Sequence, residues 1–198
     1  MAAGLVGTFL AAAAAVFAED ELYDGSVDRF YCESPRVEVV RPDRCWLFVN
    51  IEVQRRDALR VQPAAAVEEL FRNLRMRMHH PPTKATLSLY TFGFDGTAPD
   101  LGTIEARARQ DVSKRKEGVF LRSGRVRVGG RDGVLTEFEA APEGPGARGA
   151  GPGPFFVSRL DLIEPEFGFA LVFVFEVPKD RMKAALPAWK RILKNLKL

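Results

Sequence analysis

Residues able to do acid–base or metal chemistry are few and scattered in this sequence. His79 and His80 are its only histidines, and Pro81-Pro82 follows them directly. A metal site would need a third ligand at a suitable spacing, and no further Cys or His lies near the pair in the sequence. We interpret the pair as the solvated end of a helix, where cations interact favourably with the helix dipole. The sequence therefore predicts no metal site.

Nucleophilic catalysis has equally little support. The candidate serines stand outside any nucleophile-elbow or triad pattern: they are Ser88, Ser113, Ser123 and Ser158. The glycine-rich run 129–133 lacks the Lys-Ser/Thr of a P-loop and joins two predicted strands, so it predicts a tight hairpin turn. Acidic pairs such as Glu68-Glu69 have the spacing of solvated faces. We expect no enzyme, no catalytic residue and no cofactor.

A run of basic residues near the carboxyl end is the other chemical feature. Lys183, Lys190, Arg191 and Lys194 belong to a predicted helix in which Asp180 is the one nearby acid. Such a run could form a patch for an anionic partner or a membrane surface. It could also be the solvated back of a helix whose other face closes the core. The net charge of +3 is too small to predict an anionic partner by itself.

The first eighteen residues predict export. Leu5 to Ala18 is uncharged and rich in Ala, Leu, Val and Phe, and acidic residues follow it at once. This pattern is typical of a cleaved secretory signal peptide over residues 1–18, and it is short for a membrane span. Because the first four residues contain no Lys or Arg, an uncleaved anchor is the alternative. We expect cleavage near Ala18, a periplasmic or extracellular location, no transmembrane span in the mature chain, and no nucleic-acid partner.

Export makes the two cysteines candidates for a disulfide. Cys32 and Cys45 enclose twelve residues, and an oxidising compartment favours their pairing. A loop of this size would stabilise the fold by roughly 3 kcal/mol. The alternative is a pair of buried free thiols. The residues before Cys32 are not the small ones that a lipoprotein signal requires, so we expect no lipid anchor.

The elements that position these residues are clearest near the carboxyl end. Residues 167–177 carry apolar side chains on both faces, including Phe169, Phe173 and Phe175 on one and Val172 on the other. A strand of this kind must be covered on both sides, which predicts a central place in a layered domain. A final amphipathic helix with Trp189 on its apolar stripe would cover one face.

The rest of the chain predicts further strands and two more helices within a single domain over residues 19–198. With 46% hydrophobic and 28% charged residues, the composition is that of a globular protein. We expect strands or hairpin arms at 30–40, 45–53, 86–94, 119–128, 133–140 and 155–163, and helices at 64–78 and 100–117. Asp100 is a plausible N-cap for the second of these helices. Gly and Pro dominate residues 141–154, which predicts a flexible hairpin loop.

This order of elements resembles the PsbP-like superfamily, which includes the Mog-type Ran-binding proteins. The resemblance rests on the hairpin Val126–Val134, on Arg41–Trp46, on Pro178-Lys179-Asp180, and on the ending Ile192–Leu196. It implies an α+β fold, an α/β/α sandwich around a central antiparallel sheet, with about three helices and the C-terminal helix packed on the sheet. It implies exported bacterial relatives of unknown role and no shared catalytic residues.

We therefore expect an exported, non-enzymatic binding or accessory protein of the cell envelope, monomeric, that binds a protein or an envelope component. The alternative is a small-ligand or lipid-binding protein that uses a cleft between the sheet and the helix at 100–117.

Overall fold

One eight-stranded antiparallel sheet organises the protein. The computed structural model describes residues 19–94, 97–141, 153–164 and 168–198. The strand order is β1-β4-β5-β6-β10-β9-β8-β7. These strands are β1 (Tyr23–Asp24), β4 (Leu47–Val49), β5 (Leu74–His80), β6 (Ala85–Gly93), β7 (Val119–Val128), β8 (Arg131–Ala140), β9 (Phe155–Glu164) and β10 (Phe169–Pro178). The expected signal peptide, and residues 142–152 of the expected flexible loop, lie outside the described residues.

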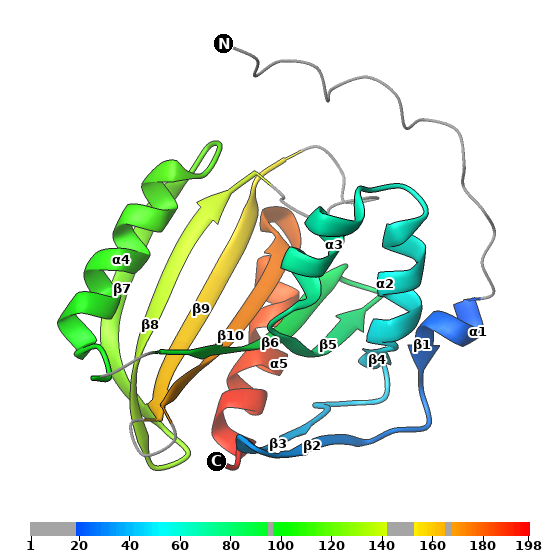
Figure 1. Cartoon of the computed structure of the whole chain (residues 1–198), viewed down its shortest axis with the longest axis horizontal. Coiled ribbons are helices and arrows are strands. Elements are labelled where there is room, and N and C mark those ends of the chain that lie inside the picture. Colours follow the sequence, from blue (N-terminus) through cyan, green and yellow to red (C-terminus); the bar gives the residue numbers. More distant parts are fainter. Residues whose placement is uncertain (1–18, 95–96, 142–152, 165–167) are drawn as a thin grey trace.

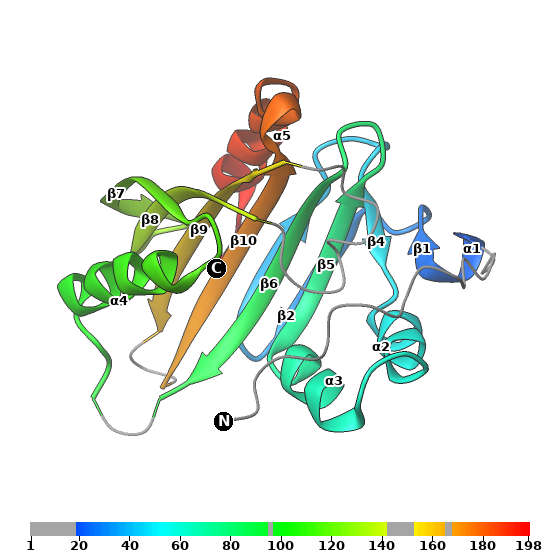
Figure 2. The ribbon, with the colours of Figure 1, turned by 90° about the horizontal axis from the view of Figure 1, so that it is seen from above.

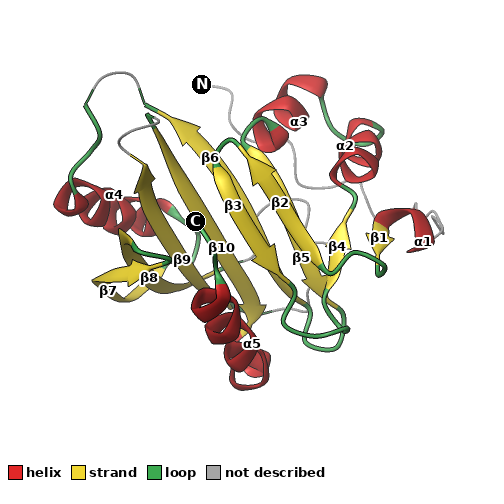
Figure 3. Ribbon diagram, turned by 90° about the horizontal axis from the view of Figure 1, so that it is seen from below, coloured by secondary structure: helices red, strands yellow, loops and turns green. Residues whose placement is uncertain are grey.

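Helices and a hairpin cover the two faces of this sheet (Figure 1). They are α1 (Glu19–Leu22), α2 (Ile51–Leu59), α3 (Ala64–Phe71), α4 (Leu101–Lys114) and α5 (Met182–Asn195), with the hairpin β2 (Arg29–Glu33) and β3 (Arg36–Val40). Helices α2, α3 and α4 lie on one face (Figure 2), whereas α5 and the β2–β3 hairpin lie on the other (Figure 3). The predicted α+β class and C-terminal helix are confirmed. The expected count of about three helices is wrong. The face that carries α5 is covered in part by the β2–β3 hairpin and not by helices alone (Figure 3).

Strand β10 occupies the predicted central place. It pairs with β6 on one side and with β9 on the other. Leu171, Phe173 and Phe175 are fully buried in the main core, beneath α5. Val174 faces the opposite way, towards the smaller cluster beneath α4. The two apolar faces of this strand therefore serve two separate cores, which is why its sequence is apolar throughout.

Helix α4 forms as its sequence predicts. The Asp100 carboxylate accepts a hydrogen bond from the Thr103 backbone N–H at 3.0 Å, which caps the helix. Ile104, Ala108 and Val112 are buried, and the helix contacts β7 and β8. Because its apolar stripe is already occupied by the sheet, α4 is a packed element and not a loosely held lid.

The prediction of a strand at 45–53 is wrong for the second half of that segment. Strand β4 ends at Val49, and Asn50 caps helix α2 by accepting a hydrogen bond from the Val53 N–H at 3.3 Å. The β-branched residues Ile51 and Val53 favour a strand by propensity, but a good N-cap and packing against α3 decide for a helix.

The helix predicted at 64–78 is also wrong beyond its middle. Helix α3 ends at Phe71, and β5 begins at Leu74. Met76 and Met78 are buried in the main core while Arg77 points to the other face, which is the two-residue period of a strand. Pro81 and Pro82 therefore follow the end of a strand instead of ending a helix.

The hairpin predicted between 119–128 and 133–140 is confirmed. Gly129 and Gly130 have φ values of +58° and +84°, which glycine adopts without the strain that a Cβ would cause. Strand β7 forms an edge of the sheet and carries exposed arginines at 122, 125 and 127. Its pairing with β8 shifts register between Phe120 and Arg122, as at a β-bulge.

Candidate functional site

The outer face of α5 gathers the four basic residues that the sequence singled out. Lys183, Lys190 and Lys194 recur at intervals of seven and four residues, so they follow one side of the helix, and Arg191 lies beside them. All four side chains are exposed. The structure therefore brings the predicted patch residues together; we call this set the α5 basic face.

The opposite side of α5 is fixed to the sheet. The Trp189 ring stacks on Phe175 with a centroid distance of 5.5 Å and an interplanar angle of 4°. Its Nε1–H donates to the buried Ser158 hydroxyl at 3.0 Å. Ala185 and Ile192 complete the buried stripe. The α5 basic face is consequently displayed by a helix that cannot rotate without breaking this packing.

The charges of the α5 basic face are not neutralised within the described part of the chain. There, no carboxylate lies within ion-pair distance of Lys183, Lys190 or Lys194. Arg191 donates through Nη1 to the Pro42 carbonyl at 2.9 Å, so its partner is a neutral backbone oxygen. Among the described residues, the face therefore carries exposed cations that have no acidic partner.

The flanks of the same segment differ, because their cations do have acidic partners. Lys179, just before α5, pairs with Glu139 at 2.7 Å. Lys197, just after it, pairs with Glu38 at 3.2 Å. These contacts tie the two ends of the helical segment to β8 and to the hairpin. Among the described residues of this segment, the lysines without an acidic partner thus lie within α5 itself, from its first turn to its last.

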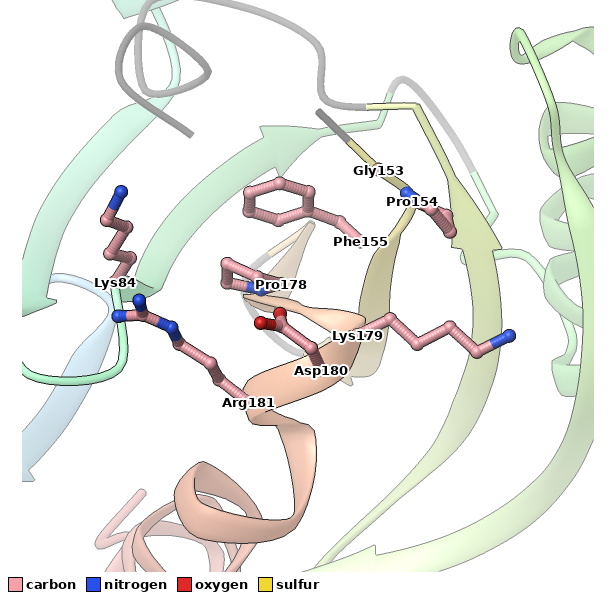
Figure 4. Close-up of a pocket in the computed structure, with 8 residues that line it drawn as sticks. All are labelled: Lys84, Gly153, Pro154, Phe155, Pro178, Lys179, Asp180 and Arg181. Atoms are coloured by element: carbon pink, nitrogen blue, oxygen red, sulfur yellow. The ribbon is translucent and has the colours of Figure 1, made fainter. Parts of the chain in front are cut away.

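A pocket of about 450 Å³ opens beside the start of α5. Figure 4 shows its lining, which combines apolar and charged side chains: Lys84, Gly153, Pro154, Phe155, Pro178, Lys179, Asp180 and Arg181. Arg181 donates to the Pro82 carbonyl at 2.9 Å and so lies against the β5–β6 turn that carries Lys84. Lys179 extends away from these two cations (Figure 4). This pocket could not be predicted from the sequence, because its walls come from three distant segments.

The expected disulfide is not formed, and this expectation is corrected. Cys32 and Cys45 are both free thiols. The Cys32 Sγ is directed at the Ser34 carbonyl at 3.4 Å, within the β2–β3 hairpin. Cys45 is exposed in the loop between β3 and β4, close to Asp43 and His80. The two thiols therefore belong to different local environments.

The two histidines end strand β5 and not a helix, so their interpretation as a solvated helix end is wrong. His79 stacks on Tyr23 at 5.7 Å, and His80 stacks on Trp46 at 5.2 Å. Burial lowers the pKa of His79, although a hydrogen bond that the ring donates to the Ala85 backbone opposes the shift. Burial also lowers the pKa of His80. Both rings are consequently held as neutral imidazoles near neutral pH.

Sequence reasoning also missed a buried ion pair on the sheet face beneath α4. The Arg159 guanidinium contacts both carboxylate oxygens of Asp161, with Nη2–Oδ1 at 2.7 Å and Nε–Oδ2 at 2.9 Å. Asp111 of α4 lies 3.7 Å from the same guanidinium. Burial raises the pKa of Asp161, and Arg159 partly opposes that rise. The alternation of polar residues at 159 and 161 with apolar neighbours was the available signal.

A second arginine occupies the same face on β5, with β6 and β10 between it and Arg159. Arg77 donates to Gln54 of α2 at 2.8 Å and to the buried Ser88 hydroxyl at 3.0 Å. Cross-strand pairing places Arg77, Ser88, Val174 and Arg159 in one row. Ser88 is hydrogen-bonded within this row, and Ser158 is hydrogen-bonded to Trp189 on the opposite face of the sheet, so each has a structural role.

Comparison with known proteins leaves the family of this chain open. No family model and no curated protein matches its sequence. Among solved structures, it resembles the cyanobacterial PsbP (CyanoP) of Synechocystis sp. PCC 6803, with 12% identity, TM-score 0.49, and coverage of 100% of this chain and 98% of that one.

Two other solved structures are similar over a smaller part of the chain. LpqN of Mycobacterium tuberculosis, involved in cell envelope biogenesis, has 12% identity and TM-score 0.46, covering 62% of this chain and 70% of that one. PA94 of Pseudomonas aeruginosa, a protein of unknown function, has 14% identity and TM-score 0.46, covering 58% and 73%. At these values the similarities carry no information about what this chain binds.

In the part of the chain that the structure describes, no helix is long and apolar enough to cross a membrane.

Proposed function

We propose that this protein is an exported, non-enzymatic binding or accessory protein of the cell envelope, and that it holds an anionic protein or envelope component on the α5 basic face. One observation carries the proposal: four cations share the exposed side of a helix whose other side is locked to the core. A solvated helix back usually mixes both signs of charge. Here the acidic partners stand only at the two ends of the segment.

The rigidity of α5 supports a binding role. Because Trp189 and Ile192 are buried, the helix does not have to be ordered when a partner arrives, so the entropic cost of binding is confined to the lysine side chains. Each exposed cation contributes about 0.2–1 kcal/mol to a contact with an anion. Four such contacts together would contribute a few kcal/mol, and the attraction would weaken as salt is added.

The environment of the hydroxyl groups supports the absence of enzymatic activity. Ser158 accepts the Trp189 indole N–H, and Ser88 accepts from Arg77. A nucleophile would need a general base at hydrogen-bond distance. In both cases the neighbour is a donor, so these hydroxyls are used for structure.

Charge reversal on α5 tests the proposal. The chain would carry Lys183→Glu, Lys190→Glu and Lys194→Glu together, and wild type and variant would be used to capture partners from an envelope extract. We expect the variant to lose at least about tenfold in affinity for the captured partner, which corresponds to about 1.4 kcal/mol. Lys183→Glu lies in the first helical turn, where an acid is favourable, and this offsets part of the cost of Lys194→Glu in the last turn.

The matched control places the same charge change on the other face of the sheet. Arg107→Glu, Lys114→Glu and Lys116→Glu alter three exposed cations at or just after α4. This variant has the same net charge as the α5 variant, so a general electrostatic effect would weaken binding equally in both. Equal capture by the α5 variant and the wild type would contradict the proposal.

The pocket beside α5 favours a second candidate function, the binding of a small ligand or lipid. The expected cleft beneath α4 is a poor place for it, because the apolar stripe of α4 is packed on the sheet. In this pocket, Phe155 and Pro178 could contact an apolar group of a ligand, and Lys84 and Arg181 could contact an anionic group of the same ligand. Native mass spectrometry of the mature protein would reveal a bound small molecule, and Arg181→Gln should reduce its occupancy.

A further inference from the structure

Three potential metal ligands from two distant segments converge at the end of strand β5. They are Asp43 and Cys45, from the loop between β3 and β4, and His80, the last residue of β5. One ligand atom from each lies within 4.8 Å of the other two. This group could not be recognised in the sequence, because α2, α3 and nearly all of β5 lie between Cys45 and His80.

The loop that carries Asp43 and Cys45 has a fixed shape. The Asp43 carboxylate accepts the Cys45 backbone N–H at 2.9 Å, and the Asp43 carbonyl accepts the Trp46 N–H at 3.3 Å. Trp46 is fully buried and anchors the end of the loop in the main core. Arg191 of α5 holds the start of the loop through the Pro42 carbonyl. The two side chains are therefore presented from a constrained turn.

His80 is oriented in the way that metal-binding histidines are. Its Nδ1 is 2.6 Å from the Thr83 hydroxyl, and its ring stacks on Trp46 with an interplanar angle of 21°. Thr83 is itself buried and is held by its backbone N–H, which donates to the His80 carbonyl at 3.2 Å. In the tautomer in which Nδ1–H donates to the Thr83 hydroxyl, this bond orients the ring and Nε2 has the lone pair that a metal requires.

The donor types select the metal. One imidazole nitrogen, one thiol and one carboxylate form a mixed N/S/O set, which suits Zn²⁺ and related divalent transition metals and does not suit Ca²⁺ or Mg²⁺. Ligand atoms around a tetrahedral zinc are about 3.5 Å apart, given bonds of about 2.0–2.3 Å. The present separations need a contraction of about 1 Å, which the exposed side chains of Asp43 and Cys45 can supply by rotation.

We propose that Asp43, Cys45 and His80 form a three-ligand site for one zinc ion or a similar transition metal, with a solvent molecule in the fourth position. On binding, the Cys45 thiol gives its proton to solvent, and the resulting thiolate and the Asp43 carboxylate neutralise the two charges of the ion. The metal links the β3–β4 loop to the end of β5, so it stabilises the folded state. Its three ligands are separate from the α5 basic face, although Arg191 of that face contacts the Pro42 carbonyl at the start of the loop.

Zinc titration of the untagged mature protein by isothermal calorimetry, with the metal alone as the probe, tests the site. We expect one ion per chain and a loss of at least about a hundredfold in affinity for Cys45→Ser and for Asp43→Asn. Both residues are exposed, so neither variant should unfold the protein. Thr83→Val removes only the bond that orients His80, and it should weaken binding about ten- to a hundredfold.

The chain provides its own matched controls. Cys32→Ser and His79→Gln remove the other thiol and the other imidazole, and both should leave the zinc affinity unchanged. With Co²⁺ as the probe, a thiolate-to-metal charge-transfer band should appear in the wild type and in Cys32→Ser, and should vanish in Cys45→Ser. The proposal is overturned if the wild type binds no zinc, if Cys45→Ser and Asp43→Asn bind it as the wild type does, or if the cobalt complex lacks the thiolate band.

Discussion

The contact between Trp189 and Ser158 yields the most detailed test of how α5 is attached to the sheet. Trp189→Phe keeps a ring on Phe175 but removes the indole N–H that donates to Ser158 at 3.0 Å. Ser158→Ala removes the acceptor instead. Both residues are almost completely buried, so water cannot replace the lost partner. The two single variants and the double variant form a thermodynamic cycle around one hydrogen bond.

The magnitudes follow from burial. Trp189→Phe leaves a buried hydroxyl unsatisfied and creates a small cavity, so it should lower the free energy of unfolding by about 3 kcal/mol. Ser158→Ala leaves the indole N–H without an acceptor, at a cost of about 2 kcal/mol. The double variant removes both polar groups, so we expect a loss of about 3 kcal/mol, roughly 2 kcal/mol less than the sum of the single losses.

Urea denaturation followed by far-ultraviolet circular dichroism measures these differences, because it does not depend on the substituted tryptophan. A loss of about 3 kcal/mol should also lower the melting temperature by roughly 6–12 °C in a chain of this size. Additive losses in the double variant would refute the reasoning, because they would mean that the two groups do not interact. A loss below about 1 kcal/mol for Trp189→Phe would mean that the base of α5 is open to water.

Three further variants test other contacts of the fold. Burial raises the pKa of Asp161 above 3.8, so protonation of Asp161 stabilises the folded state, and this contribution is lost as the pH rises through the raised pKa. Arg159→Met removes the positive charge that partly opposes this shift. In urea denaturation, the variant should lose about 3 kcal/mol of unfolding free energy at pH 7 and clearly less at pH 4. Gly133→Ala would place a Cβ 2.4 Å from the Asp161 carbonyl oxygen, so we expect a loss of about 1–3 kcal/mol by thermal denaturation. Asp100→Ala removes the cap on α4 and should cost about 1 kcal/mol, with faster amide hydrogen exchange confined to the first turn of that helix.

The carboxyl-terminal half of the fold could be predicted from the sequence because each of its elements carries a long, unambiguous period. The apolar run around Phe173 fits only a doubly covered strand, and the stripe containing Trp189 fits only a helix. In both cases local pattern and tertiary contact agree, so the prediction held.

The segment around Met76 shows why the other half was harder. Val67, Leu74 and Met78 fall at helical spacing, but Met76 and Met78 with Arg77 between them also fit a strand. Pairing of β5 with β4 and β6 decides between the two patterns, and no local window contains that information. The approach of Asp43 and Cys45 to His80 depends on the same pairing, and it was missed for the same reason.

The edge strand β7 has a consequence for how the molecule behaves at high concentration. Val119 and Leu121 are exposed apolar residues on a ten-residue strand with unpaired backbone groups on its outer side. Such an edge invites a second copy to add its own strand and so to start a chain of copies. The register shift interrupts the regular edge, and three exposed arginines line it, of which Arg122 and Arg127 pair with Glu137 and Asp132 of β8. We therefore expect the charged side chains and the register shift of β7 to hinder the addition of a second copy at this edge.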